Sequence, residues 1–526
     1  MSQKHNYLKS ASIVGMSTLA SRILGMVRDM AMASLFGAGM VLDAFVLAFT
    51  IPNLFRRFLG EGAFSAAFLP VFTEILEKEG KEKAKNLAKQ TGTFLFAILL
   101  ILVLVGILVC LLALLWDDIG DKNRIALKLS AIMMPFLLLV CWAAFAGAML
   151  NSMQHFWSPA FAPALLNFIW IAGIFLIIPL CQKDHETWAY IMAISILIGG
   201  VVQLALQWPF LKARSMPLLP DTKFSYGNPA VKKIFINMLP VLFSAAVVQV
   251  NTLMDSVIAW FMIPGDGAVT VLYMANRLMQ FPLSIFGTSL STVIFPVFSL
   301  YAVRGEKERF GNAVPEALRL CIFLGLPASL GLVILSKPII FLIYQHNSFT
   351  SESAMRTTYV LLTYSCGLCF YILLGILSRA FYALGDTKTP TMVAFVIMLS
   401  NIVLNIIIVP FIQEIGLAMT TAFGALVHCI CLLFLLQKKI PLSWQGTGIF
   451  LSKCILCNII MSIAVTVSSC FFVYHETLKQ RLMAVSIPIL LGVLVYTGSA
   501  FLLKIKELER FGVIIRREKK IAADKL

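Results

Sequence analysis

The chain has 526 residues, of which 60% are hydrophobic and only 13% are charged, and its mean hydropathy is +0.90. Soluble globular chains are roughly 45–50% apolar and 25% charged, so this composition excludes a soluble globular protein and predicts an all-α polytopic membrane protein. The formal net charge of +16 would suggest nucleic acid in a soluble chain. Here the basic residues fall in loops between apolar segments, so we expect no nucleic-acid partner and interpret them as a topology signal.

About fourteen segments are long enough to span a bilayer, which requires about 20 mainly apolar residues. The first follows a basic stretch without a small-residue cleavage site, so we expect a retained helix rather than a signal peptide. The predicted spans cover approximately residues 8–27, 34–59, 90–116, 127–150, 160–180, 187–211, 232–262, 268–300, 313–335, 356–382, 389–411, 414–437, 449–474 and 482–503.

The distribution of Lys and Arg predicts the orientation of these spans. An even number of spans places both ends of the chain on one side. The loops on that side include the lysine-rich stretch 78–89 and the basic tail 504–526, whereas the opposite loops hold few basic residues. Basic loops stay in the cytoplasm, so we expect a multi-pass membrane protein with both termini there.

A weak internal repeat divides the chain. The sequences FLPVF at 68–72 and IFPVF at 294–298 each precede a charged loop and a long apolar span. Six spans per repeat is an even number, so the two halves would share one orientation, related by a pseudo-twofold axis along the membrane normal. The predicted parts are an N-terminal lobe at 1–220, a C-terminal lobe at 221–440, two further helices at 441–503 and a basic cytoplasmic tail at 504–526.

Arginines occur at or near membrane depth in both halves. Arg22 and Arg28 belong to the first span, Arg56 follows Pro52 in the second, and Arg277 lies in the second half. A charge in hydrocarbon costs roughly 2.5–3.5 kcal/mol, so chains keep one where a cavity or a partner compensates. Arginine stays protonated, and its planar fork of donors matches phosphate oxygens. The pattern predicts a cationic cavity that suits a diphosphate better than a carboxylate.

Three acids accompany these arginines. We expect Asp29, Asp43 and Glu61 to hold the arginines in place or to exchange partners with them as a gate, rather than to touch an anion. The alternative for any single arginine is that it snorkels or forms a purely structural pair. Arg57 is the weakest candidate, because adjacent residues on a helix face apart and it follows Arg56 directly.

The motifs SRxLGxxRD, FGAG, DAF and PNLxRRxxxEGAFSxAFxP within 21–70, and RLMxFP at 277–282, resemble the MurJ (MviN) family of lipid II flippases. That family belongs to the multidrug/oligosaccharidyl-lipid/polysaccharide exporter superfamily. The resemblance runs along essentially the whole chain. It implies two six-helix lobes around a cationic cavity, with the last two helices forming a groove for an undecaprenyl tail. By the same resemblance the essential cavity arginines are Arg22, Arg28, Arg56 and Arg277, and Asp43 is a functionally sensitive acid.

The resemblance also implies a function. A member of this family would move lipid II, an undecaprenyl-diphosphate-linked disaccharide pentapeptide, from the cytoplasmic to the periplasmic leaflet by alternating access. Membrane lipids and other cell-wall synthesis proteins are then the expected partners. The sequence contains no GxxxxGK[ST], GxSxG or HExxH motif, so we expect neither an ATPase nor another enzyme, and no cofactor beyond a coupling ion.

Sodium is the coupling ion that the resemblance suggests. Some family members hold it in the second lobe, and Asp255, Asn401, Asn405 and Thr421 match that arrangement in residue type and spacing. Asn405, however, stands where those members have an acid. With one carboxylate instead of two, we expect sodium binding to be weaker or absent. The alternative is a hydrogen-bonded pair between Asp255 and an asparagine of another helix.

Other functions remain open at this point. One is a related exporter of another lipid-linked oligosaccharide or of drugs, although a drug exporter should favour carboxylates and aromatic residues over arginines in its cavity. Another is a membrane scaffold that recruits cell-wall synthesis proteins without transporting anything. An intramembrane glycosyltransferase is less favoured, because the sequence has no acidic metal-binding motif.

Overall fold

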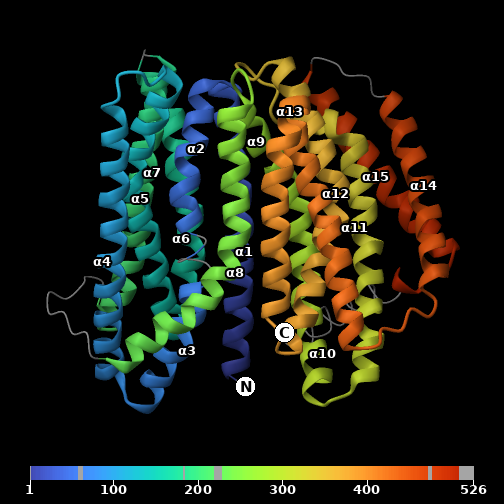
Figure 1. Ribbon diagram of the computed structural model, residues 1–526, viewed down its shortest axis with the longest axis horizontal. Helices are drawn as coiled ribbons and strands as arrows, with labels where there is room; N and C mark the ends of the chain where they lie inside the picture. Colours follow the sequence, from blue (N-terminus) through green and yellow to red (C-terminus); the bar gives the residue numbers. More distant parts are fainter. Residues whose placement is uncertain are drawn as a thin grey trace. The chain divides into compact units, whose positions relative to one another are not determined.

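A computed structural model describes residues 2–56, 58, 63–181, 184–217, 228–471 and 477–508. Over these ranges the regular secondary structure is entirely helical, with no strand. A helix bonds its own backbone N–H and C=O groups, which is the condition for crossing hydrocarbon. The chain forms two compact units, Met1–Leu253 and Met254–Leu526, so the division falls inside one helix, α8 (Figure 1). The lobe boundary predicted at 220/221 lies outside the described residues.

Unit 1 is built around α5, which packs against α2, α4 and α7, while α1 packs against α6. The first part of α8 also belongs here, because the Phe235 ring meets Phe94 of α4 at a centroid distance of 4.6 Å. The elements of this unit are α1 (Ser2–Phe36), α2 (Met40–Phe55), α3 (Ala63–Lys78), α4 (Lys81–Leu114), α5 (Asp121–Ser152), α6 (Trp157–Ala172) with its continuation to Leu180, α7 (His185–Ala213) and the beginning of α8 (Pro229–Met262).

Unit 2 is centred on α12, which packs against α9, α10, α11 and α13. Besides the end of α8 it contains α9 (Ala268–Pro282), a π-helical turn (Leu283–Thr288), α10 (Ser289–Val303), α11 (Lys307–Ile343), α12 (Ser351–Ala383), α13 (Lys388–Lys439), α14 (Thr447–Phe471) and α15 (Leu478–Leu502). The long α13 is two helices joined at Ile412 and Gln413, whose backbone angles are not helical. This break coincides with the boundary that we predicted between 411 and 414.

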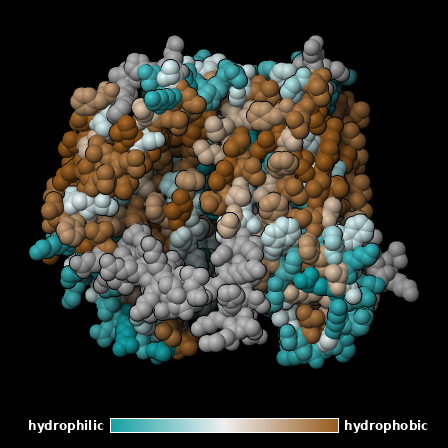
Figure 2. Space-filling view, turned by 180° about the vertical axis from the view of Figure 1, so that it is seen from behind, coloured by the Kyte–Doolittle hydropathy of each residue, from teal (hydrophilic) through white to brown (hydrophobic). Residues whose placement is uncertain are grey.

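The helices confirm a polytopic membrane protein. Among the described residues, eleven helices are long and apolar enough to cross a membrane, and α2 is a shorter apolar helix. Counting the two halves of α13 separately, and including α2 and the charged α1, gives the fourteen segments predicted. Figure 2 shows hydrophobic side chains in a band over the middle of each unit and hydrophilic side chains toward the ends. Apolar side chains that face outward at mid-height are those that lipid would cover.

The repeat seen in the sequence corresponds to similar local structure. Phe68 and Phe72 are buried on α3 around Pro70, and Phe298 is buried on α10 just after Pro296. In each unit this proline-containing helix follows a helix with an arginine in it or at its end, α2 with Arg56 in unit 1 and α9 with Arg277 in unit 2. The order of elements in the two units therefore matches the predicted duplication.

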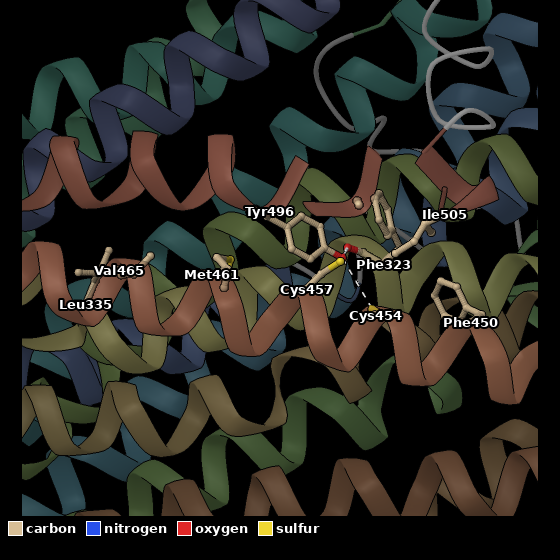
Figure 3. Close-up of a cluster of buried hydrophobic side chains, with 10 residues drawn as sticks. Phe323, Leu335, Phe450, Cys454, Cys457, Met461, Val465, Tyr496 and Ile505 are labelled. Atoms are coloured by element: carbon tan, nitrogen blue, oxygen red, sulfur yellow. Dashed lines mark hydrogen bonds between the residues drawn. The ribbon is translucent and has the colours of Figure 1, made fainter. Parts of the chain in front are cut away.

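The last two helices, α14 and α15, form a hairpin that is fixed to α11 by a buried cluster (Figure 3). The Tyr496 hydroxyl donates a hydrogen bond to the Phe323 carbonyl over 2.7 Å, and the two rings lie 5.2 Å apart. Cys454 and Cys457 are wholly buried in this cluster, as expected for cysteines that act as small apolar side chains. The cluster consists of Phe323, Leu335, Phe450, Cys454, Cys457, Met461, Val465, Tyr496, Ala500 and Ile505.

An ion pair fixes the break in α13. The Nε of Arg356, near the start of α12, lies 2.7 Å from Oε1 of Glu414, the first residue after Gln413. Arg356 Nη1 also donates to the Asp266 carbonyl, in the turn between α8 and α9, over 2.9 Å. Glu414 is buried, so its charge depends on this partner. One arginine thus connects three helix ends of unit 2.

We expect Glu414→Gln to destabilise unit 2. Removing one partner of a buried ion pair costs about 3–5 kcal/mol, and we expect the lower end because Arg356 keeps some contact with solvent. Thermal unfolding of the purified protein in detergent measures the effect as a lower Tm. Glu352→Gln, an exposed acid in the first turn of the same α12, is the control and should leave the Tm unchanged. Equal Tm values for both variants would mean that the ion pair between Arg356 and Glu414 does not stabilise unit 2.

The turn before α13 contains a second fixed acid, outside the membrane-spanning segments. Burial alone would raise the pKa of Asp386, but hydrogen bonds from Lys439 and Thr389 outweigh burial and lower the pKa to about 2. Thr389 donates through its backbone N–H over 2.9 Å and through its hydroxyl over 2.6 Å. The ionised form of Asp386 is therefore the form that the fold stabilises.

Because the folded pKa of Asp386 lies below the unfolded value of about 3.9, its contribution to stability is complete above that value and is lost as pH falls toward 2. Asp386→Asn should lower the stability at pH 7 by about 1 kcal/mol, a modest effect because Lys439 is largely exposed. The difference from wild type should disappear as the unfolding experiment is repeated at pH values approaching 2. A difference that persists there would mean that the charge is not responsible.

Candidate transport site

The first helix carries the central site residues. The predicted first span ended near residue 27, but α1 continues to Phe36, so Arg28 and Asp29 lie within the helix. The chain turns at Gly37, whose φ of +66° is a conformation that side chains with a Cβ rarely adopt. The second span begins at Met40 rather than near residue 34. The end of the first span was misplaced because Arg28 and Asp29 lower the local hydropathy, and the apolar end of α1 was therefore assigned to the second span.

Arg28 is only 4% exposed, and its guanidinium is held from several directions. Its Nε and Nη2 donate to Oδ1 of Asp29 over 3.0 and 2.6 Å. Its Nη1 donates to Oδ1 of Asn167 on α6 over 2.8 Å. The Asn167 amide in turn donates to the Ser21 carbonyl over 3.0 Å, and the Trp170 ring lies 4.3 Å from the Arg28 Cζ.

This arrangement makes a permanent charge tolerable inside an apolar helix bundle. Arginine cannot release its proton, so its burial requires a counter-charge and hydrogen-bond acceptors. Asp29, wholly buried, supplies the charge, Asn167 supplies an acceptor, and Trp170 supplies a negative ring face. Trp170 is itself fixed by edge contacts with Phe45 and Phe49 of α2, at 5.6 and 5.2 Å. The Arg28 site therefore joins α1, α2 and α6.

Asn167 and Trp170 were not identified as site residues from the sequence. They lie three residues apart on α6, so they face the same side of that helix. The available signal was an amide and an indole at this spacing in an otherwise apolar span. Nothing in the sequence, however, indicated that this face meets Arg28, which is 139 positions away.

The other predicted residues of unit 1 lie on α1 and α2. Arg22 is exposed on α1. Arg56 is partly buried at the end of α2, where its Nε donates to Oδ1 of Asn53 over 3.0 Å. Asp43 is wholly buried in the first turn of α2, where the helix dipole favours a negative charge. Glu61, and Arg57 beside Arg56, lie outside the described residues.

Arg277 is the predicted arginine of unit 2. It is partly buried on α9, and its Cζ lies 5.7 Å from the centre of the Tyr273 ring. Its neighbours Asn276 and Gln280 hydrogen-bond to each other. The π-helical turn that begins at Leu283 follows immediately, and such irregular turns often occur at functional sites.

Unit 2 also brings together the residues considered for sodium. Asn405 is wholly buried, and its amide nitrogen donates to Oδ1 of Asp255 over 2.7 Å and to Oδ1 of Asn401 over 3.0 Å. The Asn405 carbonyl oxygen accepts from the Thr420 hydroxyl. Thr421, the predicted ligand, lies toward Asp255, but its buried hydroxyl makes no hydrogen bond of ordinary length and angle.

This donor set does not fit a sodium ion as it stands. Hard cations take oxygen ligands, and Asp255, Asn401 and Thr421 provide oxygens. Asn405, however, presents an N–H₂ donor to Asp255 and Asn401 and turns its oxygen toward Thr420. The predicted alternative, a hydrogen-bonded pair between Asp255 and an asparagine, is the arrangement that the structure contains.

The fold is that of a multi-helix membrane protein with charged side chains buried among its helices. An inward-facing multidrug resistance MATE family transporter of the MOP superfamily shares the fold, with a TM-score of 0.67 over 79% of this chain and 93% of that one, at 14% identity. A sequence model of the lipid II flippase MurJ family matches residues 32–486. The chain belongs to this MurJ family.

Two individual relatives support the assignment. The probable lipid II flippase MurJ of Vibrio cholerae is 35% identical over 433 residues, which is 80% of this chain and 81% of the relative. The solved structure of a lipid II flippase MurJ in an inward closed conformation has a TM-score of 0.75 at 28% identity, covering 93% of this chain and 97% of that chain.

We expect Asn167→Leu to lower the Tm, because it removes an acceptor from a buried charged donor, a loss of about 1–3 kcal/mol. Asn167→Asp keeps an acceptor facing Arg28 and should retain more of the stability. Thermal unfolding of the two variants beside wild type tests whether the acceptor matters. If the leucine variant were as stable as wild type, Asn167 would not be holding Arg28.

Proposed function

We propose that this chain moves lipid II from the cytoplasmic to the periplasmic leaflet of the bacterial inner membrane, with both termini in the cytoplasm. The observation that carries the proposal is the buried Arg28 guanidinium, held by Asp29, Asn167 and Trp170 within the membrane-spanning part of a MurJ-family chain. A fixed arginine suits a diphosphate, the group that links the lipid and the sugar of this substrate.

The geometry of the Arg28 pair suggests how a diphosphate would bind. Asp29 occupies the Nε and Nη2 positions of the guanidinium, and this is an edge that can bind two phosphate oxygens in parallel. Substrate would therefore replace Asp29 on that edge, while Asn167 and Trp170 keep the guanidinium in place. In this proposal Asp29 is an exchangeable partner and Asn167 is a positioning residue.

Arg22, Arg56 and Arg277 complete the proposed binding set. Arg277 is contributed by unit 2 and the other two by unit 1, so alternating access would present the substrate to arginines from both halves of the chain. Asp43 and Glu61 act in the proposal as ion-pair partners of the arginines. The undecaprenyl tail would remain in lipid beside α14 and α15, which are fixed to α11 by the buried cluster.

The drive for transport would come from a gradient rather than from ATP. Moving one charge through 100 mV is worth about 2.3 kcal/mol, which is enough to shift a conformational equilibrium of a few kcal/mol. Export of drugs is not favoured, because the relatives found are lipid II flippases and Arg28 keeps a permanent positive charge in unit 1 beside the buried acids Asp29 and Asp43. Association with other cell-wall synthesis proteins is compatible with transport and forms part of the proposal.

Complementation in bacteria depleted of their own lipid II flippase tests the proposal, with periplasmic exposure of lipid II as the readout. Wild type should restore growth and exposure, whereas Arg28→Ala and Arg277→Ala should reduce exposure by an order of magnitude or more. Arg28→Lys should also fail, because lysine keeps the charge but not the planar fork. Arg309→Ala is the matched control, since this arginine is exposed on α11 and pairs with Glu306.

The outcomes separate the competing functions. Rescue by all the variants would mean that the arginines do not bind substrate. Failure of a well-inserted wild type would indicate a different lipid-linked substrate. Restored growth without restored lipid II exposure, in the wild type and in both alanine variants, would favour the scaffold.

A further inference from the structure

The polar cluster of unit 2 contains a neutral group where a cation would be expected. Asp255 comes from α8, Asn401 and Asn405 come from the first half of α13, and Thr420 comes from the second half. Asp255 is 9% exposed and Asn405 is 0% exposed. The cluster therefore joins α8 to both halves of α13 through hydrogen bonds, and its buried polar groups must satisfy one another.

Both hydrogens of the Asn405 amide are used within this cluster. One points to Oδ1 of Asp255 at an N···O distance of 2.7 Å, and the other to Oδ1 of Asn401 at 3.0 Å. Both distances are those of ordinary N–H···O hydrogen bonds. The amide nitrogen bridges a carboxylate and a carbonyl oxygen, as a cation between them would.

Thr420 fixes the direction in which the amide points. Its hydroxyl lies beside both the Asn405 carbonyl oxygen and the Leu417 backbone carbonyl, at 3.0 Å from the latter. To coordinate a cation, Asn405 would have to rotate its oxygen toward Asp255 and Asn401, and this would bring three oxygens together. It would also give up the hydrogen bond that Thr420 donates to Asn405. The observed orientation is the one that needs no ion.

We propose that the Asn405 amide takes the place of a coupling sodium ion in this chain, so that the hydrogen-bonded contact of α8 with α13 is independent of sodium. Asn405 is then the residue that determines ion specificity. An aspartate at 405 would lose both donors and place a second carboxylate beside Asp255. Two buried carboxylates in contact need a cation or a proton between them. A single substitution should therefore create the sodium requirement that the amide removes.

The test measures sodium binding by thermal unfolding of the purified full-length protein in detergent. Wild type should have the same Tm in NaCl, KCl and choline chloride of equal ionic strength. Asn405→Asp should have a lower Tm in choline chloride and regain several degrees as NaCl is added, in a saturable way that KCl does not reproduce. A ligand that binds only the folded state raises stability in this manner.

A matched control separates sodium binding from the general effect of a new buried acid. Asn458, on α14, is also buried, and its amide donates to the Cys454 backbone carbonyl over 2.8 Å rather than to a carboxylate. Asn458→Asp should lower the Tm by a similar amount in all three salts. Sodium-specific recovery in Asn405→Asp, but not in Asn458→Asp, is the result expected.

Two results would overturn the proposal. The first is a saturable, sodium-specific rise in the Tm of wild type that Asp255→Asn abolishes, a comparison that stands even if Asn405→Asp does not fold. The second is a folded Asn405→Asp protein whose Tm does not respond to sodium. This proposal rests on the proposed transport function, because a coupling ion matters only in a protein that transports. The unfolding measurement uses no lipid II, so it can fail or succeed independently of the complementation experiment.

Discussion

The structure of unit 1 depends on keeping one guanidinium charged inside an apolar helix bundle. Desolvation of an ion costs several kcal/mol even after the protein relaxes, and Arg28 cannot avoid that cost by losing a proton. Asp29 on the same helix and Asn167 and Trp170 on α6 compensate for it together. Packing of Trp170 against Phe45 and Phe49 then carries the constraint into α2. Three helices are positioned by the needs of one side chain.

Unit 2 also stabilises a buried charged group, but with a neutral amide in place of an opposite charge. A carboxylate, Asp255, is buried there, and the described contacts give it an amide donor from Asn405 rather than a guanidinium. An amide bridges two acceptors without adding a charge, so the cluster fixes α8 against α13 while remaining independent of an ion in our proposal. The family resemblance led us to consider a sodium ion at this position. The Asn405 side chain changes that expectation, because its amide nitrogen rather than its oxygen faces Asp255 and Asn401.

The sequence predicted the fold to a large extent, because hydropathy and helix breaks are local properties. It placed the break of α13 between 411 and 414, where Ile412 and Gln413 leave the helix. It misplaced the end of α1, since Arg28 and Asp29 dilute the apolar signal of a helix that continues to Phe36. Local hydropathy therefore predicts where most helices lie, but charged site residues lower the hydropathy and make the helix ends harder to predict.

Of the candidate site in unit 1, the sequence predicted the charged residues but not their neutral partners. Arg28 and Asp29 were identified because a charge at membrane depth is costly and therefore informative. Asn167 and Trp170 were not, because an amide or an indole in a span is common and its partner is set by tertiary packing. The same limitation affected Thr420, since sequence spacing favoured Thr421 and only the packing of the two halves of α13 shows which hydroxyl meets Asn405.

The Arg28–Asp29 pair also bears on release, the step that a transporter needs as much as binding. A guanidinium without a partner in a low-dielectric site would hold a diphosphate too strongly to let it go. Asp29 competes for the same edge of the guanidinium, so net binding of a phosphate is the difference between two ion pairs rather than the full strength of one. Since the pair is formed by adjacent residues of α1, the competitor is always present. Under the proposed function, the acid beside Arg28 is what allows substrate to leave on the far side of the membrane.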